Sequence, residues 1–275
     1  MEVREALALA GTLALQRIDA QLLLLHVLGR SINDRAWLLA HDTDVLTDDV
    51  RTAFDSACKR RAAGEPVAYI VGQKDFHGLT LSVDARVLVP RPDTETLVDW
   101  ALELLDETAK ARVVDLGTGS GAIALAIRHA RANVDVTAVD ASADALAVAQ
   151  SNASRLGLAI DFVQGNWLAG VDGTFDLIVS NPPYIAAGDP HLPALQHEPP
   201  QALVAGADGL DGIRSIVDQA LPRLQPGRWL LLEHGFDQAA AVRTLLSQRG
   251  FAQVCSRRDL ADIERCSGGQ RPIAG

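Results

Sequence analysis

The sequence has few cysteines and no long apolar run, and each absence excludes a class of protein. Its three cysteines, Cys58, Cys255 and Cys266, are odd in number and far apart, so the sequence indicates neither a disulfide framework nor a zinc site. Because no apolar run reaches the length of a membrane span, we expect no membrane association. The start of the chain carries acids and lacks the apolar core of a secretory signal, so we expect a cytoplasmic protein.

Basic residues are also scarce. The 275 residues include 25 Lys and Arg against 35 Asp and Glu, which gives a net charge of −10. Attraction to a nucleic-acid backbone depends on clustered Lys and Arg, so we expect no stable nucleic-acid binding. The hydrophobic content of 48% is enough for a substantial core, in one large domain or in a large and a small one.

The spacing of apolar residues predicts a change of structure along the chain. Residues 1–63 have helical spacing, which predicts a small N-terminal helical bundle. Residues 64–91 alternate at Val67, Tyr69 and Val71 and again from Leu79 to Val83. We therefore expect a β-hairpin linker with its turn near His77-Gly78.

From residue 92 to residue 275 strand and helix patterns alternate. This alternation predicts an α/β domain with a parallel, Rossmann-like sheet and helices on both faces. The glycine-rich segment 266–272 is poorly suited to a final strand. The expected strands are 112–116, 134–139, 159–164, 175–180, 227–234 and 251–257, and the expected helices are 93–108, 121–131, 142–156, 209–223 and 237–249.

The tetrapeptide Asn181-Pro182-Pro183-Tyr184 directly follows one buried strand. The prolines have a fixed φ and no N–H, so nearby carbonyls point in defined directions. Asn181 adds an amide oxygen acceptor, and Tyr184 adds a flat face for stacking. Acceptors beside an aromatic plane suit an NH₂ group on an sp² carbon, as in an amide or an amino-heterocycle.

A glycine-rich turn, Gly117-Thr118-Gly119-Ser120-Gly121, follows the strand that ends at Asp115-Leu116. Glycines allow a ligand to approach the backbone, and Asp140 at the next strand end suits a ribose diol. The turn also satisfies the relaxed dinucleotide pattern, which keeps an NAD-binding interpretation open. Against it, Asp115 suits a cation better than a pyrophosphate, and a dehydrogenase does not require the tetrapeptide.

Together these motifs resemble a class I S-adenosylmethionine-dependent methyltransferase, and most closely the release factor glutamine N5-methyltransferase family, called HemK or PrmC. The resemblance covers nearly the whole chain. It includes the blocks 19–29, 64–70, 89–95, 189–192 and 230–235. It implies an S-adenosylmethionine-binding methyltransferase domain over residues 92–275 and a substrate-recognition domain over residues 1–63.

The resemblance also implies roles for individual residues, with S-adenosylmethionine as cofactor and S-adenosylhomocysteine as product. The turn would wrap the methionine part, with Asp115 near its ammonium and Asp140 on the ribose. Asn166 and Trp167 resemble the adenine-facing pair, although the family more often has an acid at position 166. The Asn181 side chain and the Pro182 carbonyl would accept both N–H bonds of the substrate amide beside the cofactor, and Pro183 and Tyr184 would shape the slot. The residues with a cofactor role are Asp115, Gly117, Thr118, Gly119, Ser120, Gly121, Asp140, Asn166, Trp167 and Asn181.

The implied reaction is methylation of the glutamine side-chain amide nitrogen (N5) in the Gly-Gly-Gln motif of peptide chain release factors by a monomeric enzyme. One alternative is adenine N6-methylation of nucleic acid, because adenine also carries an amino group on a planar ring. Another is a noncatalytic binding module, which the intact motifs disfavour. Gly268-Gly269-Gln270 itself spells the substrate tripeptide, and we interpret this match as coincidence.

Some polar residues receive structural interpretations. No step of this chemistry requires a histidine, so His77, His191, His197 and His234 are expected to be structural or loop residues. Glu198 is expected to order the loop after the tetrapeptide or to meet the substrate. Two interpretations remain open for Glu233 (support of Asn181 or a satisfied strand-end carboxylate) and for Arg91 (a brace of the pocket or a surface salt bridge).

Overall fold

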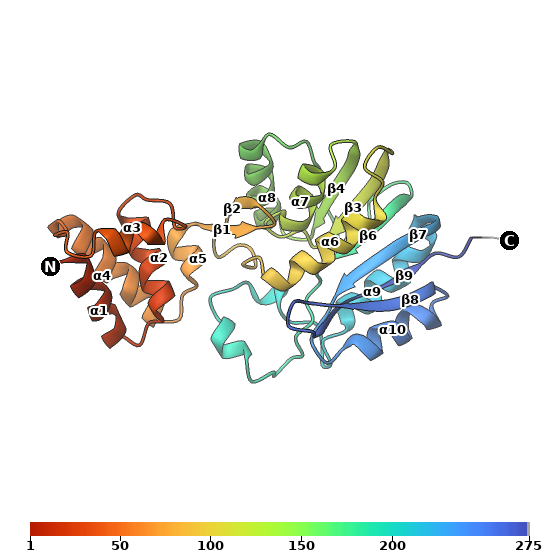
Figure 1. Cartoon of the computed structure of the whole chain (residues 1–275). Coiled ribbons are helices and arrows are strands. Elements are labelled where there is room, and N and C mark those ends of the chain that lie inside the picture. The colour runs from red at the N-terminus through yellow and green to blue at the C-terminus, as the bar shows by residue number, and fades with distance from the viewer. Residues whose placement is uncertain (274–275) are drawn as a thin grey trace. The chain divides into compact units, whose positions relative to one another are not determined.

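The computed structural model describes residues 1–273. The chain divides into two compact units, Met1–Gln73 and Lys74–Gly275. The first unit is helical (Figure 1). Its core contains Leu23, Leu24 and Leu25, which are fully buried together with Phe54 from a neighbouring helix. Its helices are α1 (Val3–Thr12), α2 (Arg17–Val27), α3 (Arg35–Ala40), α4 (Asp48–Ala62) and α5 (Val67–Val71).

The helix α5 corrects one prediction, because residues 67–71 were expected to form a strand of the hairpin. The alternation of Val67, Tyr69 and Val71 does not mark one buried face, since the intervening Ala68 and Ile70 are buried as well. Pro66 precedes the helix, and Gly72 ends it with a φ of 74°. A proline before and a left-handed glycine after are typical helix boundaries.

The predicted hairpin turn at His77-Gly78 is confirmed. It joins strands β1 (Gln73–Phe76) and β2 (Leu79–Ser82) in a two-stranded sheet. His77 has a φ of 46° and Gly78 a φ of 77°. Two consecutive positive φ values match the twist of a short hairpin, and the glycine adopts this region without a Cβ clash.

The second unit contains a seven-stranded sheet with the order β5-β4-β3-β6-β7-β9-β8. Strands β3 to β7 are parallel in their pairings, and β9 pairs antiparallel with both β7 and β8. The strands are β3 (Ala111–Leu116), β4 (Val134–Asp140), β5 (Asp161–Gln164), β6 (Phe175–Ser180), β7 (Leu224–Glu233), β8 (Ala252–Arg258) and β9 (Glu264–Gln270).

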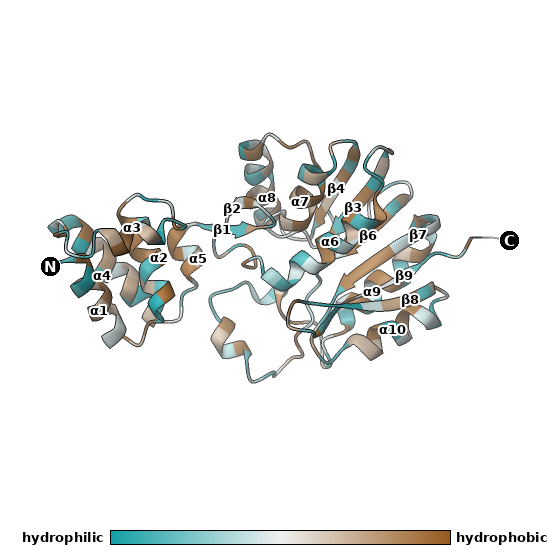
Figure 2. Cartoon of the chain, viewed as in Figure 1, coloured by the Kyte–Doolittle hydropathy of each residue, from teal (hydrophilic) through white to brown (hydrophobic). Residues whose placement is uncertain are grey.

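Helices cover both faces of this sheet, as predicted. Residues of β3 alternate between the faces, so that Val113 packs with α6 and α7 while Val114 packs with α9 and α10. Strands buried on both faces carry continuous apolar runs, and the carboxyl half of β7 is such a run (Figure 2). The helical elements are η1 (Pro92–Thr94), α6 (Glu95–Leu104), α7 (Ala122–Ala130), α8 (Ala143–Leu156), η2 (Leu192–Leu195), η3 (Pro200–Ala202), α9 (Asp211–Ala220), η4 (Leu221–Arg223) and α10 (Ala239–Gln248).

The strand β9 corrects the prediction that segment 266–272 is poorly suited to a strand. A Cβ on Gly268 would lie 2.6 Å from Leu231 Cδ2 and 2.9 Å from Trp100, and one on Gly269 would lie 2.8 Å from Phe251 Cβ. The glycines therefore let β9 fit under large side chains. Gln270 donates to the Gly227 carbonyl at 2.8 Å, so this Gly-Gly-Gln segment is part of the sheet.

Two further observations concern the cysteines and membrane spans. Cys58, Cys255 and Cys266 are free thiols, of which Cys255 is exposed. Across residues 1–273, every helix is too short or too polar to cross a membrane.

Candidate functional site

The site is built at the carboxyl ends of three adjacent parallel strands. Leu116 of β3 pairs with Val139 of β4 on one side and with Ser180 of β6 on the other. The residues that follow these strands therefore meet at one edge of the sheet. The glycine turn follows β3, Asp140 ends β4, and Asn181 follows β6. Ligands of such sheets bind beyond this edge.

A cavity of about 180 Å³ opens at this edge. Its wall combines residues from the glycine turn, from the ends of β4 and β5, from the tetrapeptide and from two loops. The lining residues are Arg86, Val87, Leu88, Gly117, Gly119, Asp140, Ala141, Ser142, Ala145, Gly165, Asn166, Trp167, Asn181, Pro183, Pro199, Gln201 and Ala202.

The glycine turn presents bare backbone to this cavity. Gly117 and Gly119 have φ values of 72° and 56° and line the wall. The N–H groups of Gly117 and Thr118 both donate to the Val139 carbonyl, at 2.8 and 2.9 Å, which ties the turn to β4. Gly121 does not line the cavity. A Cβ at this position would lie 2.9 Å from Leu125 Cδ1, so the absence of a side chain allows close packing against α7.

Asp140 supports the turn and faces the cavity. Its Oδ2 accepts from Gly119 N and its Oδ1 from Ser142 N, both at 2.9 Å. Each carboxylate oxygen can accept a further hydrogen bond. The group can therefore receive ligand hydroxyls while it holds the turn.

Asp115 lies behind the turn rather than on the cavity wall. It is fully buried, and its Oδ2 accepts from Thr118 Oγ1 at 2.6 Å and from Ala124 N at 3.2 Å. Its Oδ1 is buried without a partner. Burial raises the pKa of this carboxyl to about 7, against the lowering effect of the two hydrogen bonds. A nearby cation would offset that cost.

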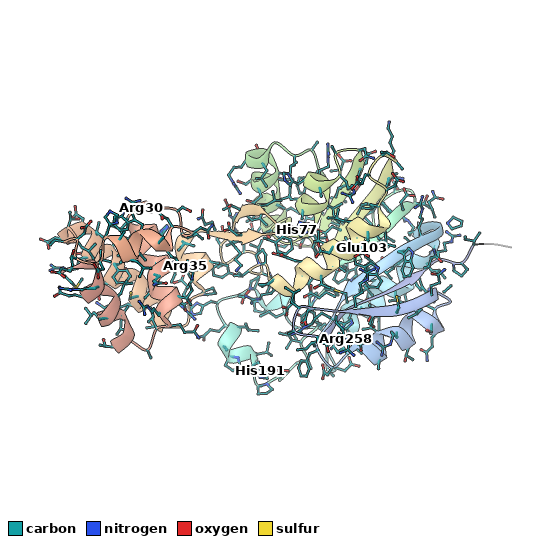
Figure 3. The ribbon with its side chains drawn as sticks, in the orientation of Figure 1. Arg30, Arg35, His77, Glu103, His191 and Arg258 are labelled. Carbon is teal, nitrogen blue, oxygen red and sulfur yellow. The ribbon has the colours of Figure 1, made fainter. Side chains whose placement is uncertain are left out.

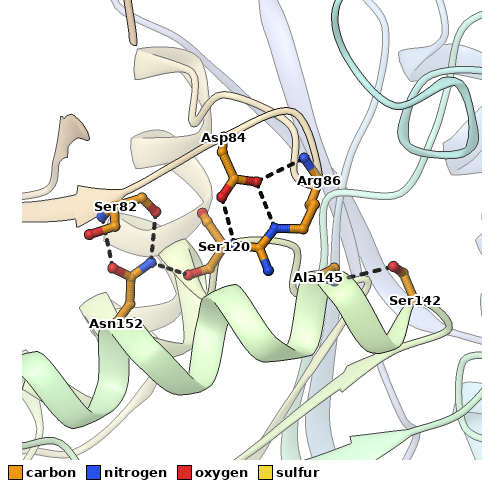
Figure 4. A network of polar contacts seen from close by, with 7 residues as sticks. All are labelled: Ser82, Asp84, Arg86, Ser120, Ser142, Ala145 and Asn152. Atoms are coloured by element: carbon orange, nitrogen blue, oxygen red, sulfur yellow. Dashed lines mark hydrogen bonds and ion pairs between the residues drawn. The ribbon is translucent and has the colours of Figure 1, made fainter. Parts of the chain in front are cut away.

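Thr118 and Ser120 are also buried and lie off the wall. The carbonyl of Ser120 accepts from Asn152 Nδ2 at 3.0 Å, and Asn152 exchanges two more hydrogen bonds with the backbone of Ser82 (Figure 4). Asn152 is 0% exposed, so this network connects strand β2 with the glycine turn. Sequence reasoning missed it, because an Asn inside an amphipathic helix gives no signal of its partners.

Asn166 and Trp167 follow β5 and line the cavity. Trp167 has a φ of 55°, which is uncommon for a large side chain. A Cβ on Gly117 would lie 3.4 Å from its ring, so the indole packs directly against the turn. The aromatic plane thus borders the same space as Asp140.

The tetrapeptide divides between the cavity and the interior. Asn181 and Pro183 line the wall, whereas Pro182 and Tyr184 do not. Asn181 Nδ2 donates to Thr94 Oγ1 at 3.1 Å, and Tyr184 donates through its hydroxyl to Glu233 Oε1 at 3.5 Å. Burial raises the pKa of the Tyr184 phenol, so the hydroxyl remains a proton donor at neutral pH.

Two loop segments on the wall were not predicted, namely 86–88 and 199–202. They are joined through Glu198, which is 4% exposed and accepts from Val89 N at 3.0 Å. Glu198 also pairs with Arg91. The expectation that Glu198 orders its loop is confirmed. Arg91 does not line the cavity, and its ion pair joins a partly exposed guanidinium to a buried carboxylate.

His77 and His191, labelled in Figure 3, lie off the cavity wall. His77 pairs with Asp99, and His191, whose side chain is exposed, pairs with Asp189. His234 is buried between the Gly235 carbonyl and Ser267 Oγ, and burial lowers its pKa. Among the described residues, the cavity wall contains no histidine.

Comparison with known proteins adds two family matches. Residues 1–72 match the PrmC N-terminal domain, and residues 94–206 match the methyltransferase small domain. The chain is 48% identical over 271 residues to the release factor glutamine methyltransferase of Xylella fastidiosa (strain Temecula1), covering 97% of this chain and 98% of that protein. It is 50% identical over 259 residues to the protein of the same name from Bordetella pertussis, covering 93% and 95%.

Solved structures show the same fold at low sequence identity. A methyltransferase from Pyrococcus furiosus superposes with a TM-score of 0.56 at 19% identity, covering 71% of this chain and 90% of that one. A 16S rRNA methyltransferase of T. Thermophilus, solved with AdoMet and guanosine, gives 0.56 at 20% identity, covering 72% and 49%. At these identities the likeness shows the fold of the second unit alone.

Proposed function

The chain belongs to the release factor glutamine methyltransferase family, and we propose that it transfers a methyl group from S-adenosylmethionine to a glutamine side-chain amide nitrogen (N5) of peptide chain release factors. The target is the glutamine of their Gly-Gly-Gln motif. One observation carries the proposal: Asn181 and Pro183 line the same cavity as Gly117, Gly119 and Asp140. A site for a planar amide therefore borders a site suited to a nucleoside.

The cavity wall fits the parts of this cofactor. Asp140 has free lone pairs for ribose hydroxyls, and Trp167 offers a plane to adenine. Backbone of Gly117 and Gly119 is open to a methionine chain, whereas Thr118, Ser120 and Gly121 support the turn from behind. The buried, unpartnered Asp115 Oδ1 suits the field of an ammonium group. When bound, the cofactor supplies a methyl group on a positively charged sulfonium.

The protein's own contribution to the reaction is orientation and electrostatics. An amide nitrogen is a poor nucleophile because its lone pair is delocalised into the carbonyl. In our proposal the Asn181 side chain and the Pro182 carbonyl accept the two N–H bonds, and Pro183 and Tyr184 shape the slot. Correct alignment of reactants can supply about 7–11 kcal/mol of a barrier. Acceptors beside the nitrogen also stabilise the positive charge that develops there.

The proposal also covers the roles of the domains, the oligomeric state and the cellular compartment. We assign recognition of the release factor to residues 1–63 and cofactor binding to residues 92–275. Of the segment 64–91, expected as a linker, helix α5 belongs to the first unit. The enzyme acts as a monomer in the cytoplasm, where release factors work, without stable nucleic-acid binding. The net charge of −10 supports the last point, because no excess of Lys and Arg is present.

Mass spectrometry of a purified release factor, incubated with this protein and S-adenosylmethionine, tests the function. We expect one added methyl group, located on the Gly-Gly-Gln glutamine. A factor purified from cells that already carries the methyl group would mask the result, so an unmethylated factor is required. If cofactor binding is confirmed and no methyl group is added, the proposal fails and an adenine-DNA methylation assay becomes the next experiment.

A further inference from the structure

The side-chain amide of Asn181 is held from one side only. Its Nδ2 donates to Thr94 Oγ1 at 3.1 Å. Within residues 1–273, no group donates to Asn181 Oδ1, although the residue lines the cavity. An amide fixed through its NH₂ group leaves its oxygen available to a ligand.

The Thr94 hydroxyl lies in a buried cluster of polar groups. Thr94 is 4% exposed and lies where η1 meets α6. Burial raises the pKa of Glu233, the last residue of β7, and the nearby Thr94 hydroxyl lowers it. Glu233 Oε2 is buried and has no hydrogen-bond partner among the described residues. Glu233 is 1% exposed and also receives the Tyr184 hydroxyl at 3.5 Å. Residues from three distant segments therefore meet behind Asn181.

This cluster favours one orientation of the Asn181 amide when Glu233 is ionised, above a pH of about 7. An ionised carboxylate only accepts hydrogen bonds, so the Tyr184 and Thr94 hydroxyls then direct their protons towards Glu233. Thr94 has one proton, and once this proton is donated to Glu233, only oxygen lone pairs face Asn181. The amide must then present its NH₂ group to Thr94. A flipped amide would set two oxygens against each other and leave a buried acceptor unpaired.

We propose that Thr94 and Glu233 are positioning residues that fix the orientation of the Asn181 amide, so that its oxygen accepts an N–H of the substrate amide. The inference rests on the proposed function, since it deepens the role of Asn181. If the Asn181 amide were flipped, its NH₂ group would face an N–H of the substrate amide, and Asn181 Oδ1 could no longer accept that hydrogen bond. The Asn-Pro-Pro-Tyr motif thus depends on a threonine 87 positions earlier in the chain.

The test compares Thr94→Val, which removes the hydroxyl and keeps the shape, with Thr94→Ser, which keeps the hydroxyl. Methyl transfer to a purified release factor is measured by mass spectrometry over time, and S-adenosylmethionine affinity by calorimetry. Because one hydrogen bond is lost, we expect kcat of Thr94→Val to fall by about tenfold and cofactor Kd to stay within about twofold. Thr94→Ser should retain about half or more of wild-type turnover.

Two controls separate positioning from damage to the fold. Thr80→Val removes a surface hydroxyl that donates to Asp75, and we expect no change in turnover. Thr94→Ala removes the same hydroxyl without a second methyl group, in case Thr94→Val folds poorly. Circular dichroism and the thermal midpoint establish the folded fraction of each variant.

A double-mutant cycle gives the decisive result. If Thr94 acts through Asn181, adding Thr94→Val to Asn181→Ala changes turnover by less than about twofold. The same tenfold loss in both backgrounds would overturn the inference, and so would an active wild type with an unaffected Thr94→Val. A wild type that does not methylate the release factor would instead overturn the proposed function, and the inference with it.

Discussion

Asp140 Oδ2 accepts a hydrogen bond from the backbone N–H of Gly119 at 2.9 Å, so the end of β4 holds the glycine turn that follows β3. The same carboxylate receives Ser142 N at the start of α8. One side chain therefore couples two strand ends and a helix start on the wall of a single cavity. A change at Asp140 is expected to disturb both the turn and the ligand.

We predict that Asp140→Asn weakens S-adenosylmethionine binding by about tenfold or more. The amide has one acceptor oxygen, so its NH₂ group would face either Gly119 N or Ser142 N and a ribose hydroxyl would lose its acceptor. Calorimetric titration measures the change. Asp135→Asn, an exposed residue of the same strand, is the matched control and should bind as the wild type does.

We predict that Asn181→Ala lowers turnover about a hundredfold, or on the order of 3 kcal/mol in the barrier. The reason is the loss of an acceptor that orients the amide nitrogen and stabilises charge in the transition state. Affinity for the cofactor should change little. Single-turnover methylation of a release factor measures the effect, and unchanged turnover in a folded variant would contradict the role.

We predict that Glu198→Ala destabilises the second unit by about 2 kcal/mol, because it leaves Val89 N and the Arg91 guanidinium without their buried acceptor. The loss of stability is limited because the Arg91 side chain is 36% exposed, so water can solvate its guanidinium when Glu198 is removed. Urea unfolding measures it. Glu103→Ala, which breaks the exposed pair with Arg257, is the control and should cost under about 1 kcal/mol. If Glu198→Ala and Glu103→Ala lowered the free energy of unfolding equally, a bracing role for Glu198 would be contradicted.

We predict that Gly268→Ala destabilises the sheet by about 1–3 kcal/mol, as expected for overpacking. Its Cβ would lie 2.6 Å from Leu231 Cδ2 and 2.9 Å from both the Leu230 carbonyl and the Trp100 ring. The carbonyl belongs to the paired strand β7 and has little freedom to move. Denaturant unfolding followed by tryptophan fluorescence gives the value, and a variant as stable as the wild type would show that β9 is looser than described.

We predict that Glu233→Gln becomes more stable relative to the wild type as pH rises from 5 to 8. Burial raises the pKa of Glu233 from an ordinary 4.5 to about 7, with Asp93 raising it further and the hydrogen bond from Thr94, the field of Arg265 and the hydrogen bond from Tyr184 lowering it. The folded state therefore binds this proton more tightly than the unfolded state does. The associated stability is complete below the unfolded pKa and is lost as pH rises through about 7.

Urea unfolding of both proteins at the two pH values checks this prediction. The free energy of unfolding of Glu233→Gln, relative to that of the wild type, should be higher at pH 8 than at pH 5. Glu103→Gln is the control, because the hydrogen bond from Arg257 lowers the pKa of Glu103. This group therefore titrates below the tested range, and the effect of its substitution should be nearly the same at pH 5 and pH 8. A difference that does not change with pH would mean that Glu233 has the same pKa in the folded and unfolded states.

The sequence alone determined the parallel sheet and the chemistry at its edge. Strands such as 175–180 are buried on both faces and read as continuous apolar runs, and the polar residue that follows each run marks the carboxyl end. Asn181, Asp140 and the glycine turn were therefore each placed at a strand end from the sequence, and the family resemblance implied that they share one site. The hairpin turn at His77-Gly78 could also be predicted from local sequence, because it depends on the backbone conformation of only two residues.

Tertiary structure decided what depends on contacts between distant segments. Residues 67–71 became a helix because every side chain from Ala68 to Val71 is buried, which alternation does not reveal. Segment 264–270 became a strand because its glycines fit under Trp100 and Phe251. The pairing of Glu198 with Val89, and of Thr94 with Asn181, joins residues about a hundred positions apart. Local pattern carries no information on such pairs, since only the packed sheet and its loops bring them within hydrogen-bond distance.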